Sequence, residues 1–352
     1  MKYKEIFMKR AIQIAKNGLG LTSPNPMVGC VIERNGFVLS EGCHYKKGMY
    51  HAEFLAINNI KNKCLFLDCT LYVTLEPCVH FGETPPCVDL IIRKNIPRVV
   101  VGIQDPCDKV KGLGIKKLKK YGIEVIENVL IDQCRVLNKR FFTFYEKKRP
   151  FIILKWAQSN DGFIYSENKK DNWISGIYAR QLNHKWRSEE DGILVGKKTV
   201  LNDNPKLNVR KWFGKNPVRI FIDQKLSISN SYFILDSSQH TIVFTEKYQK
   251  NRKNIEYIQI SFEEKIINQI LNFLYKKKIL SLIVEGGKKT LENFIKENIW
   301  DECRIFMCQK ILKSGLKAPK IKGIISKKID LDKDQFILKY PVKNSIVSIS
   351  SA

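Results

Sequence analysis

Four residues in the N-terminal half of the chain have the types and the spacing of a hydrolytic metal site. His51 and Glu53 flank an alanine, and Cys78 and Cys87 follow with eight residues between them. A catalytic zinc ion is typically held by three protein ligands, which leaves one coordination position for water. His51, Cys78 and Cys87 can supply those ligands. Glu53 is not needed as a ligand and can instead move protons between water and a leaving nitrogen.

The order of these residues favours catalysis over the alternatives. A lone His-x-Glu triplet carries little information. Followed by Pro77-Cys78 and a second cysteine, it matches the zinc deaminase signature, with eight residues rather than two between the cysteines. A structural zinc would need a fourth ligand, which His80 or Cys30 could supply. Buried cysteines and a surface histidine without metal are the remaining alternative.

The elements around the four residues follow from local patterns. His51 opens a helix expected over residues 51–60, and an apolar strand is expected over residues 71–75. Cys78 follows that strand, where a helix-like turn can begin and its N-terminus would favour a thiolate. A helix is expected over residues 87–94, and a single long helix over residues 131–145.

Strands and helices alternate along the whole chain, which indicates α/β layers. Three basic residues and a proline at residues 147–150 end the first pattern, and a second α/β pattern begins at Phe151. A length of 352 residues favours two domains. We predict domains over residues 1–146 and 151–352, joined by a linker at residues 147–150.

Composition limits the class of protein. We find no apolar run long enough for a membrane span and no signal peptide, so we expect a cytoplasmic protein without membrane contact. The ten cysteines are too dispersed for a secreted disulfide framework. The formal charge of +26 allows a nucleic-acid or anionic partner, but the dispersed lysines favour a compositional bias.

With these residues in view, the chain resembles the family of bifunctional riboflavin-biosynthesis deaminase–reductases. In the first domain the resemblance rests on residues 24–30 (Pro-Asn-Pro-Met-Val-Gly-Cys), on His51-Ala-Glu53, and on residues 75–87 with their Thr-Pro-Pro-Cys ending. In the second domain it rests on seven segments, namely residues 149–155, 161–162, 173–176, 192–196, 199–201, 207–210 and 284–287. It covers nearly the whole chain.

The resemblance implies a fold and two reactions. A cytidine-deaminase-like three-layer domain would be followed by a domain similar to dihydrofolate reductase. The first would use one Zn²⁺ per chain to hydrolyse the 2-amino group of 2,5-diamino-6-(5-phosphoribosylamino)pyrimidin-4(3H)-one, with Glu53 shuttling the proton. The second would reduce the ribosyl group to ribityl with NADPH. The family also suggests a homo-oligomer, a dimer or a tetramer.

The resemblance further implies roles for individual residues. Substrate contacts fall on Asn25, His44, His80, Asp171, Arg187, Leu207, Arg210 and Glu285, and Asp105 lies on a substrate-side loop. Cofactor contacts fall on Ala157, Trp173, Thr199 and Asp203. Elementary chemistry supports the roles of Arg187 and Arg210, because two guanidinium groups can bind a phosphate through paired hydrogen bonds. Gly286 and Gly287, between a strand and a helix, leave N–H groups free for cofactor phosphate.

Several positions depart from the family pattern. Glu83 stands where a basic residue is usual, and Asp171 where serine is usual. Cys107-Asp108 replaces Asn-Pro, and Asn204 replaces the second of two aspartates. The four residues of the metal site are unchanged.

One further hypothesis differs in class. An RNA-editing deaminase with an appended basic domain would use the same zinc chemistry and the same positive charge. The second domain, which looks reductive, favours the two-step enzyme and a small phosphorylated pyrimidine without nucleic acid.

Overall fold

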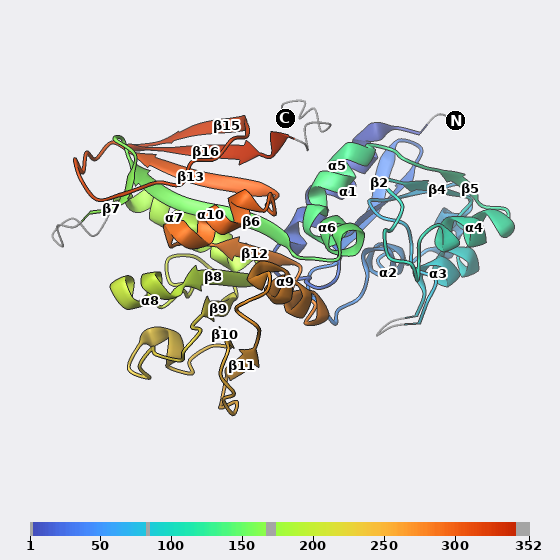
Figure 1. Cartoon of the computed structure of the whole chain (residues 1–352). Helices are drawn as coiled ribbons and strands as arrows, with labels where there is room; N and C mark the ends of the chain where they lie inside the picture. Colours follow the sequence, from blue (N-terminus) through green and yellow to red (C-terminus); the bar gives the residue numbers. More distant parts are fainter. Residues whose placement is uncertain (1–2, 82–84, 167–173, 343–352) are drawn as a thin grey trace. The chain divides into compact units, whose positions relative to one another are not determined.

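The computed structural model describes residues 3–81, 85–166 and 174–342 (Figure 1). The chain forms two compact units, residues 1–148 and residues 149–352, called the N-terminal unit and the C-terminal unit below. Among the described helices, none combines the length and the apolar character that spanning a membrane requires.

The N-terminal unit is built on five strands, which are β1 (Gly29–Arg34), β2 (Phe37–Cys43), β3 (Thr70–Val73), β4 (Arg98–Val101) and β5 (Glu124–Ile126). They form one sheet in the order β2-β1-β3-β4-β5. β1 pairs antiparallel with β2 and β3, whereas β3, β4 and β5 run parallel. Asn35 and Gly36 connect β1 to β2 with φ of 53° and 87°, which is the tight hairpin turn that this residue pair favours.

Helices cover both faces of this sheet. They are α1 (Glu5–Ala15), α2 (Ala52–Asn58), α3 (Cys87–Arg93), α4 (Leu113–Lys120), α5 (Ile131–Leu137) and α6 (Lys139–Lys147). One buried cluster joins apolar side chains of α2, α3 and α4 to one face of the sheet. On the other face a Cβ on Gly29 of β1 would lie 2.0 Å from the carbonyl oxygen of Ala11 in α1. The result is a three-layer α/β/α unit.

The single helix expected over residues 131–145 is wrong, because α5 and α6 are separated at Asn138. Asn138 has φ of −107° and ψ of 28°, outside the helical range. Its buried amide accepts from Met27 N and donates to Met27 O, both at 2.8 Å. These bonds mimic a strand pair and hold the residue in place, so the helix is interrupted where the side chain reaches the loop before β1.

The C-terminal unit contains a nine-stranded sheet in the order β11-β10-β9-β8-β12-β6-β13-β16-β15. Its strands are β6 (Phe151–Ser159), β8 (Gly192–Gly196), β9 (Val218–Ile222), β10 (Thr241–Thr245), β11 (Ile255–Gln259), β12 (Ser281–Val284), β13 (Glu302–Cys308), β15 (Ile324–Leu331) and β16 (Asp334–Tyr340). All neighbours from β11 to β13 are parallel, and β16 and β15 are added antiparallel. A separate pair joins β7 (Phe163–Tyr165) to β14 (Leu316–Lys317).

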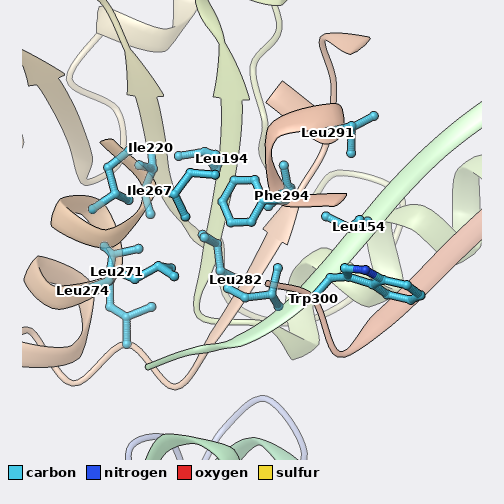
Figure 2. Close-up of a cluster of buried hydrophobic side chains, with 14 of the residues drawn as sticks. Leu154, Leu194, Ile220, Ile267, Leu271, Leu274, Leu282, Leu291, Phe294 and Trp300 are labelled. Carbon is cyan, nitrogen blue, oxygen red and sulfur yellow. The ribbon is translucent and has the colours of Figure 1, made fainter. Parts of the chain in front are cut away.

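Two buried clusters fill the two faces of this sheet. One joins α9 (Ile266–Lys276) and α10 (Lys288–Lys296) to the strands through side chains such as Leu271, Leu282 and Phe294 (Figure 2). The other joins α7 (Ile177–Glu189) and α8 (Lys197–Asp203) to the opposite face. Because both faces are covered, the central strands are continuous apolar runs.

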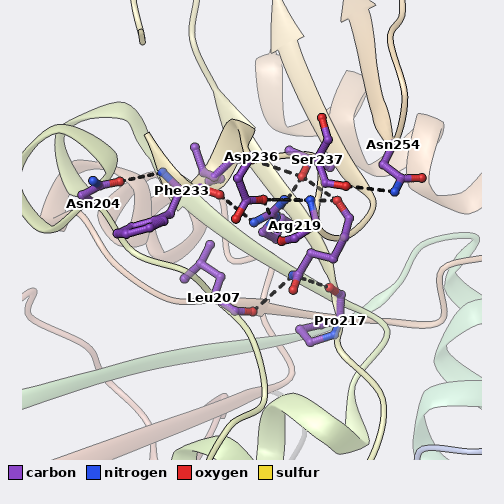
Figure 3. Close-up of polar contacts among 12 residues, drawn as sticks. Asn204, Leu207, Pro217, Arg219, Phe233, Asp236, Ser237 and Asn254 are labelled. Carbon is purple, nitrogen blue, oxygen red and sulfur yellow. Dashed lines mark hydrogen bonds and ion pairs between the residues drawn. The ribbon is translucent and has the colours of Figure 1, made fainter. Parts of the chain in front are cut away.

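A buried arginine attaches a long connection to this sheet. Arg219 of β9 donates to Phe233 O (2.8 Å), Gln239 O (3.1 Å) and the Asp236 carboxylate (2.9 Å), as Figure 3 shows. It also donates to Thr241 Oγ1 at 2.9 Å. The guanidinium thus satisfies groups that a buried loop would otherwise leave unpaired.

The sequence also predicts a strand over residues 37–43 and helices over residues 177–189 and 288–296, and β2, α7 and α10 confirm these bounds. Among the described α-helices and strands, β7, α8, β11 and β14 were not anticipated. Each spans only two to seven residues. Over so short a length a periodic pattern hardly develops, and tertiary pairing decides the structure.

Candidate functional site

Three potential metal ligands come together in the N-terminal unit. The donor atoms of His51, Cys78 and Cys87 all lie within 4.8 Å of one another. His51 Nδ1 is 3.6 Å from Cys78 Sγ and 3.4 Å from Cys87 Sγ. Two sulfurs and one imidazole are a donor set that suits Zn²⁺. Neither Cys30 nor His80 belongs to this group, which holds no fourth donor among the residues that the structure describes.

Each ligand is placed by the end of an element. His51 is the N-cap of α2 and Cys87 is the first residue of α3, after the proline that caps it. Cys78 lies in the loop after β3, so the expectation that it begins a helix-like turn is wrong. Proline is favoured at helix starts, and Pro86 sets this start at Cys87. The backbone N–H of Cys87 has no acceptor within the helix and donates to Cys78 Sγ at 3.4 Å. The N-terminus of α3 therefore lies opposite that thiol.

Burial and charge give these groups unusual proton affinities. A hydrogen bond from Cys87 is the main cause that lowers the pKa of Cys78 to about 4. The same bond, together with burial, raises the pKa of Cys87. The Glu53 side chain is buried in the first turn of α2, and burial, reinforced by the charge of Cys78, raises its pKa to about 7. A carboxyl group with that pKa can both accept and return a proton near neutral pH.

Asn25 and His44 lie beside this group. The amide nitrogen of Asn25 is 3.3 Å from His44 Nε2, and His44 Nδ1 is 3.2 Å from the carbonyl oxygen of Tyr50. A carbonyl can only accept, so Nδ1 carries the hydrogen and Nε2 accepts from the Asn25 amide. The ring of His44 packs edge-on against His51, with centroids 5.5 Å apart. His80, in contrast, is exposed on the loop after Cys78.

Sequence reasoning gave no role to Glu76, which lies two residues before Cys78. Its carboxylate is buried and accepts backbone N–H groups from residues 105–115. The sequence held one signal for this role, which is a charged residue between a buried strand and Pro77-Cys78. A carboxylate at that position must find hydrogen-bond partners inside the protein.

A second cluster of charges is buried in the C-terminal unit. Glu285, which follows β12, receives a hydrogen bond from Arg187 Nη2 of α7 and pairs with Lys155 Nζ of β6 at 3.0 Å. Burial opposes the charged form of Glu285, but Arg187 and then Lys155 outweigh it and lower its pKa to about 2. Burial also lowers the pKa of Lys155. The carboxylate thus stays ionised between two cations.

Lys155 was not predicted as a site residue. Its signal was visible, since it is a lone cation within the apolar strand Phe-Ile-Ile-Leu-Lys-Trp-Ala. A buried lysine is rare unless it is paired. Its ion-pair partner is Glu285, and no spacing rule connects positions so far apart in the sequence.

The other predicted contacts of the C-terminal unit fall into groups. Arg210 is exposed and donates to Asn208 Oδ1 at 3.0 Å, while Arg187 Nη1 donates to Asn208 O at 3.4 Å, so the two arginines share Asn208. Leu207 is buried in the core, with φ of 49°. Burial, with the charges of Arg187 and Arg210, lowers the pKa of nearby His184 to about 4.

The predicted cofactor residues are partly brought together. A Cβ on Gly286 would lie 3.1 Å from Thr199 Oγ1, and one on Gly287 would lie 3.3 Å from the same atom. Both glycines have positive φ, at 121° and 70°. Ala157 lies on β6 opposite Phe306 of β13, and Asp203 is the last residue of α8. Trp173, Asp171 and Glu83 lie outside the described residues.

Comparison with known proteins matches each unit separately. Residues 1–103 match the family model of the cytidine and deoxycytidylate deaminase zinc-binding region. Residues 150–326 match that of the RibD C-terminal domain, which spans half of the chain.

Whole-chain relatives are similar over both units. The riboflavin biosynthesis protein RibD of Aquifex aeolicus is 40% identical over 315 residues, 88% of each chain. RibD of Actinobacillus pleuropneumoniae is 36% identical, over 87% of this chain and 84% of its own. The crystal structure of a diaminohydroxyphosphoribosylaminopyrimidine deaminase/5-amino-6-(5-phosphoribosylamino)uracil reductase from Thermotoga maritima superposes with a TM-score of 0.87 at 38% identity, covering 96% of this chain and 98% of that one.

These findings confirm the predicted fold class, a cytidine-deaminase-like domain followed by a reductase domain similar to dihydrofolate reductase. They give no support to the RNA-editing alternative, because the C-terminal unit matches a reductase domain.

Proposed function

Since this chain belongs to the RibD family of riboflavin biosynthesis proteins, we propose that it catalyses two successive steps on one phosphorylated pyrimidine. The first step is deamination of 2,5-diamino-6-(5-phosphoribosylamino)pyrimidin-4(3H)-one. The second is NADPH-dependent reduction of the ribosyl group to ribityl phosphate. We assign the first step to residues 1–146 and the second to residues 151–352.

In the first step His51, Cys78 and Cys87 would hold Zn²⁺, and Glu53 would move the proton. The fit rests on three soft or borderline donors within 4.8 Å of one another. Zn²⁺ would supply a nucleophile at neutral pH by acidifying water. A Glu53 carboxylate oxygen would accept one proton and return it to the leaving amino group. Its pKa of about 7 allows both transfers.

Asn25 orients the pyrimidine in this step. Because its amide nitrogen donates to His44 Nε2, its Oδ1 is left as an acceptor for an N–H group of the ring. His44 contacts the substrate edge and holds the amide in that orientation, and His80 on the exposed loop contacts the outer part of the substrate.

In the second step the buried charges of the C-terminal unit organise the ribosyl group. NADPH supplies the hydride. Thr199 with Gly286 and Gly287 binds its phosphates, helped by Ala157, Trp173 and Asp203. The Lys155 ammonium is buried beside Glu285 and can donate a proton to the sugar oxygen as the hydride arrives at carbon. Arg187, Arg210, Leu207, Glu285 and Asp171 complete the substrate site.

We also propose that the enzyme is a homo-oligomer in the cytoplasm. The outer strand β15 supports the first part, because most of its side chains are exposed and its edge offers hydrogen bonds to another strand. The ten free cysteines suit a reducing compartment. Mass measurement in solution tests the oligomer, and a dominant monomer at working concentration would contradict it.

The observation that carries the proposal is the three-donor cluster with a buried glutamate two residues from its histidine. The test is incubation of the zinc-loaded protein with the diaminopyrimidine phosphate, with and without NADPH, followed by mass detection of products. We expect the deaminated product without NADPH, and its reduced form when NADPH is added. No released ammonia under either condition would overturn the proposal.

A further inference from the structure

Glu76 is a buried carboxylate for which the two reactions above have no role. It lies between β3 and Cys78, with a side chain 3% exposed. Its backbone N–H donates to Ile103 O at 3.0 Å, which continues the pairing of β3 with β4. Placing a carboxylate in such a position is unfavourable unless it is well hydrogen-bonded.

The carboxylate of Glu76 accepts four backbone N–H groups from the segment after β4. Oε1 accepts from Gly114 N at 2.9 Å and from Ile115 N at 3.2 Å. Oε2 accepts from Gly112 N at 2.9 Å and from Asp105 N at 3.2 Å. Each oxygen therefore has two donors, and one side chain holds both ends of the segment from residue 105 to residue 115.

These bonds also complete the start of α4. The N-cap of α4 is Gly112, which has no side chain to cap the helix, and the first turn has no acidic residue. Glu76 supplies from another element both the missing acceptors and the negative charge that a helix N-terminus favours.

α4 in turn contacts the segments that carry both cysteine ligands. A Cβ on Gly114 would lie 2.3 Å from Pro77 O, so the first turn of α4 packs directly on the backbone before Cys78. Lys117 of α4 forms an ion pair with Asp89 of α3, the helix that begins at Cys87.

The same bonds fix the backbone of Asp105. The Asp105 side chain is buried, and its Oδ1 accepts Cys107 N at 2.7 Å. Burial, with smaller contributions from the charges of Glu76 and Cys78, raises its pKa to about 7.

We propose that Glu76 is a positioning residue of the deaminase, which holds the backbone before Cys78 and the backbone of Asp105 at fixed places. This inference rests on the deaminase activity proposed above. Glu76 touches neither the donor atoms nor a reacting group. It acts through the loop and through α4, and its effect is on geometry.

The test replaces one of the two carboxylate oxygens of Glu76 without changing the shape of the side chain. In Glu76→Gln one terminal oxygen becomes an amide nitrogen, which faces two N–H donors and loses both bonds. We expect deaminase kcat/KM to fall about 10- to 100-fold, mainly through kcat, and zinc release to a chelator to become about 10-fold faster. Reduction of the deaminated intermediate in the same preparation should keep its rate, and a zinc content of one ion per chain should show that the N-terminal unit is folded.

The matched control is Asp223→Asn. Asp223 is also a buried carboxylate that accepts a loop amide, from Ile228 N at 2.8 Å, but it belongs to the C-terminal unit. The Asp223→Asn substitution should leave the deaminase kcat and KM and the rate of zinc release unchanged. Glu76→Asp keeps the charge but is shorter by one methylene, and should recover part of the loss. The cobalt-substituted protein reports ligand geometry directly, so its absorption bands should shift in Glu76→Gln and not in Asp223→Asn.

Three outcomes decide the matter. Wild-type kcat, KM and zinc release in folded Glu76→Gln would overturn the proposal, as would an equal loss of deaminase activity in Asp223→Asn. Should the wild-type protein release no ammonia, the proposed function fails, whereas faster zinc release and altered cobalt bands in Glu76→Gln would still support positioning.

Discussion

Two buried glutamates, one in each unit, have opposite proton affinities. Burial, reinforced by the charge of Cys78, raises the pKa of Glu53 to about 7. The Glu285 side chain, 10% exposed, is also largely enclosed, yet Arg187 and Lys155 overcome burial and lower its pKa to about 2. Both residues are glutamates in enclosed positions, so the neighbours make the difference.

The difference separates two uses of a carboxyl group. Glu53 can exchange a proton near neutral pH, which suits an acid–base catalyst. Glu285 stays charged and holds two cations, which suits a site that must orient a sugar and keep Lys155 protonated. Breaking either environment should therefore damage one reaction and spare the other.

The largest expected effect is metal removal. Dialysis against a chelator should reduce ammonia release to background, because His51, Cys78 and Cys87 cannot activate water without a bound metal ion. NADPH oxidation with the deaminated intermediate should be unchanged, since Glu285 and its partners need no metal. Adding Zn²⁺ back should restore deamination. Loss of both activities on chelation would contradict the separation of the two sites.

Glu53→Gln should have the next largest effect. The amide has nearly the same shape but cannot accept a proton, so deaminase kcat should fall about 10²- to 10⁴-fold. Zinc content should stay at one per chain, because Glu53 is not part of the donor group. Reductase kcat measured on the same sample is the control. A decrease of less than about 10-fold would assign the proton transfer to another group.

The sequence predicts the first of these sites better than the second, and the reason is distance along the chain. His51 caps the helix that carries Glu53 in its first turn, and Cys78 and Cys87 bracket one loop, so their spacing already reflects their geometry. Zinc chemistry also demands particular residue types, which makes the pattern recognisable.

The charge cluster around Glu285 has neither advantage. Lys155, Arg187 and Glu285 come from β6, α7 and the end of β12, and only the folded sheet brings them together. In the local sequence, Lys155 is simply one residue of an otherwise apolar strand. The break at Asn138 was hidden for the same reason, because its partner Met27 is 111 residues away. Family resemblance found Arg187 and Glu285, but it did not reveal that they bind each other.

Glu285→Gln should have a smaller effect on rate but a large one on stability. It leaves Lys155 and Arg187 buried without a counter-charge, which typically costs about 3–5 kcal/mol. We expect the C-terminal unit to unfold at lower denaturant concentration and reduction to slow by less than deamination slows in Glu53→Gln, with deamination retained. The matched control is Glu256→Gln, whose ion pair with half-exposed Lys277 is worth about 0–1 kcal/mol. Equal destabilisation by the two substitutions would contradict the view that the Glu285 pair is special.

The smallest expected effect is an opposite response of the two units to mild acid. Burial raises the pKa of Asp105 from its ordinary value of 3.8 to about 7, so between these values the folded N-terminal unit holds a proton that the unfolded chain lacks. Its contribution to stability therefore rises as the pH falls from 7 towards 4. Burial lowers the pKa of His184 from its ordinary value of 6.5 to about 4, so the unfolded chain binds the extra proton. Its contribution is lost over the same range, because the unfolded state is stabilised instead.

Each group can change the free energy of unfolding by at most about 1.4 kcal/mol per pH unit. Hydrogen exchange of peptides from each unit at pH 7 and pH 5 measures the two responses separately. Asp105→Asn should remove the gain in the N-terminal unit, and His184→Gln should reduce the loss in the C-terminal unit. If both substitutions shifted the two units in the same direction, burial together with the neighbouring charges would not be what sets the proton affinity of these two groups.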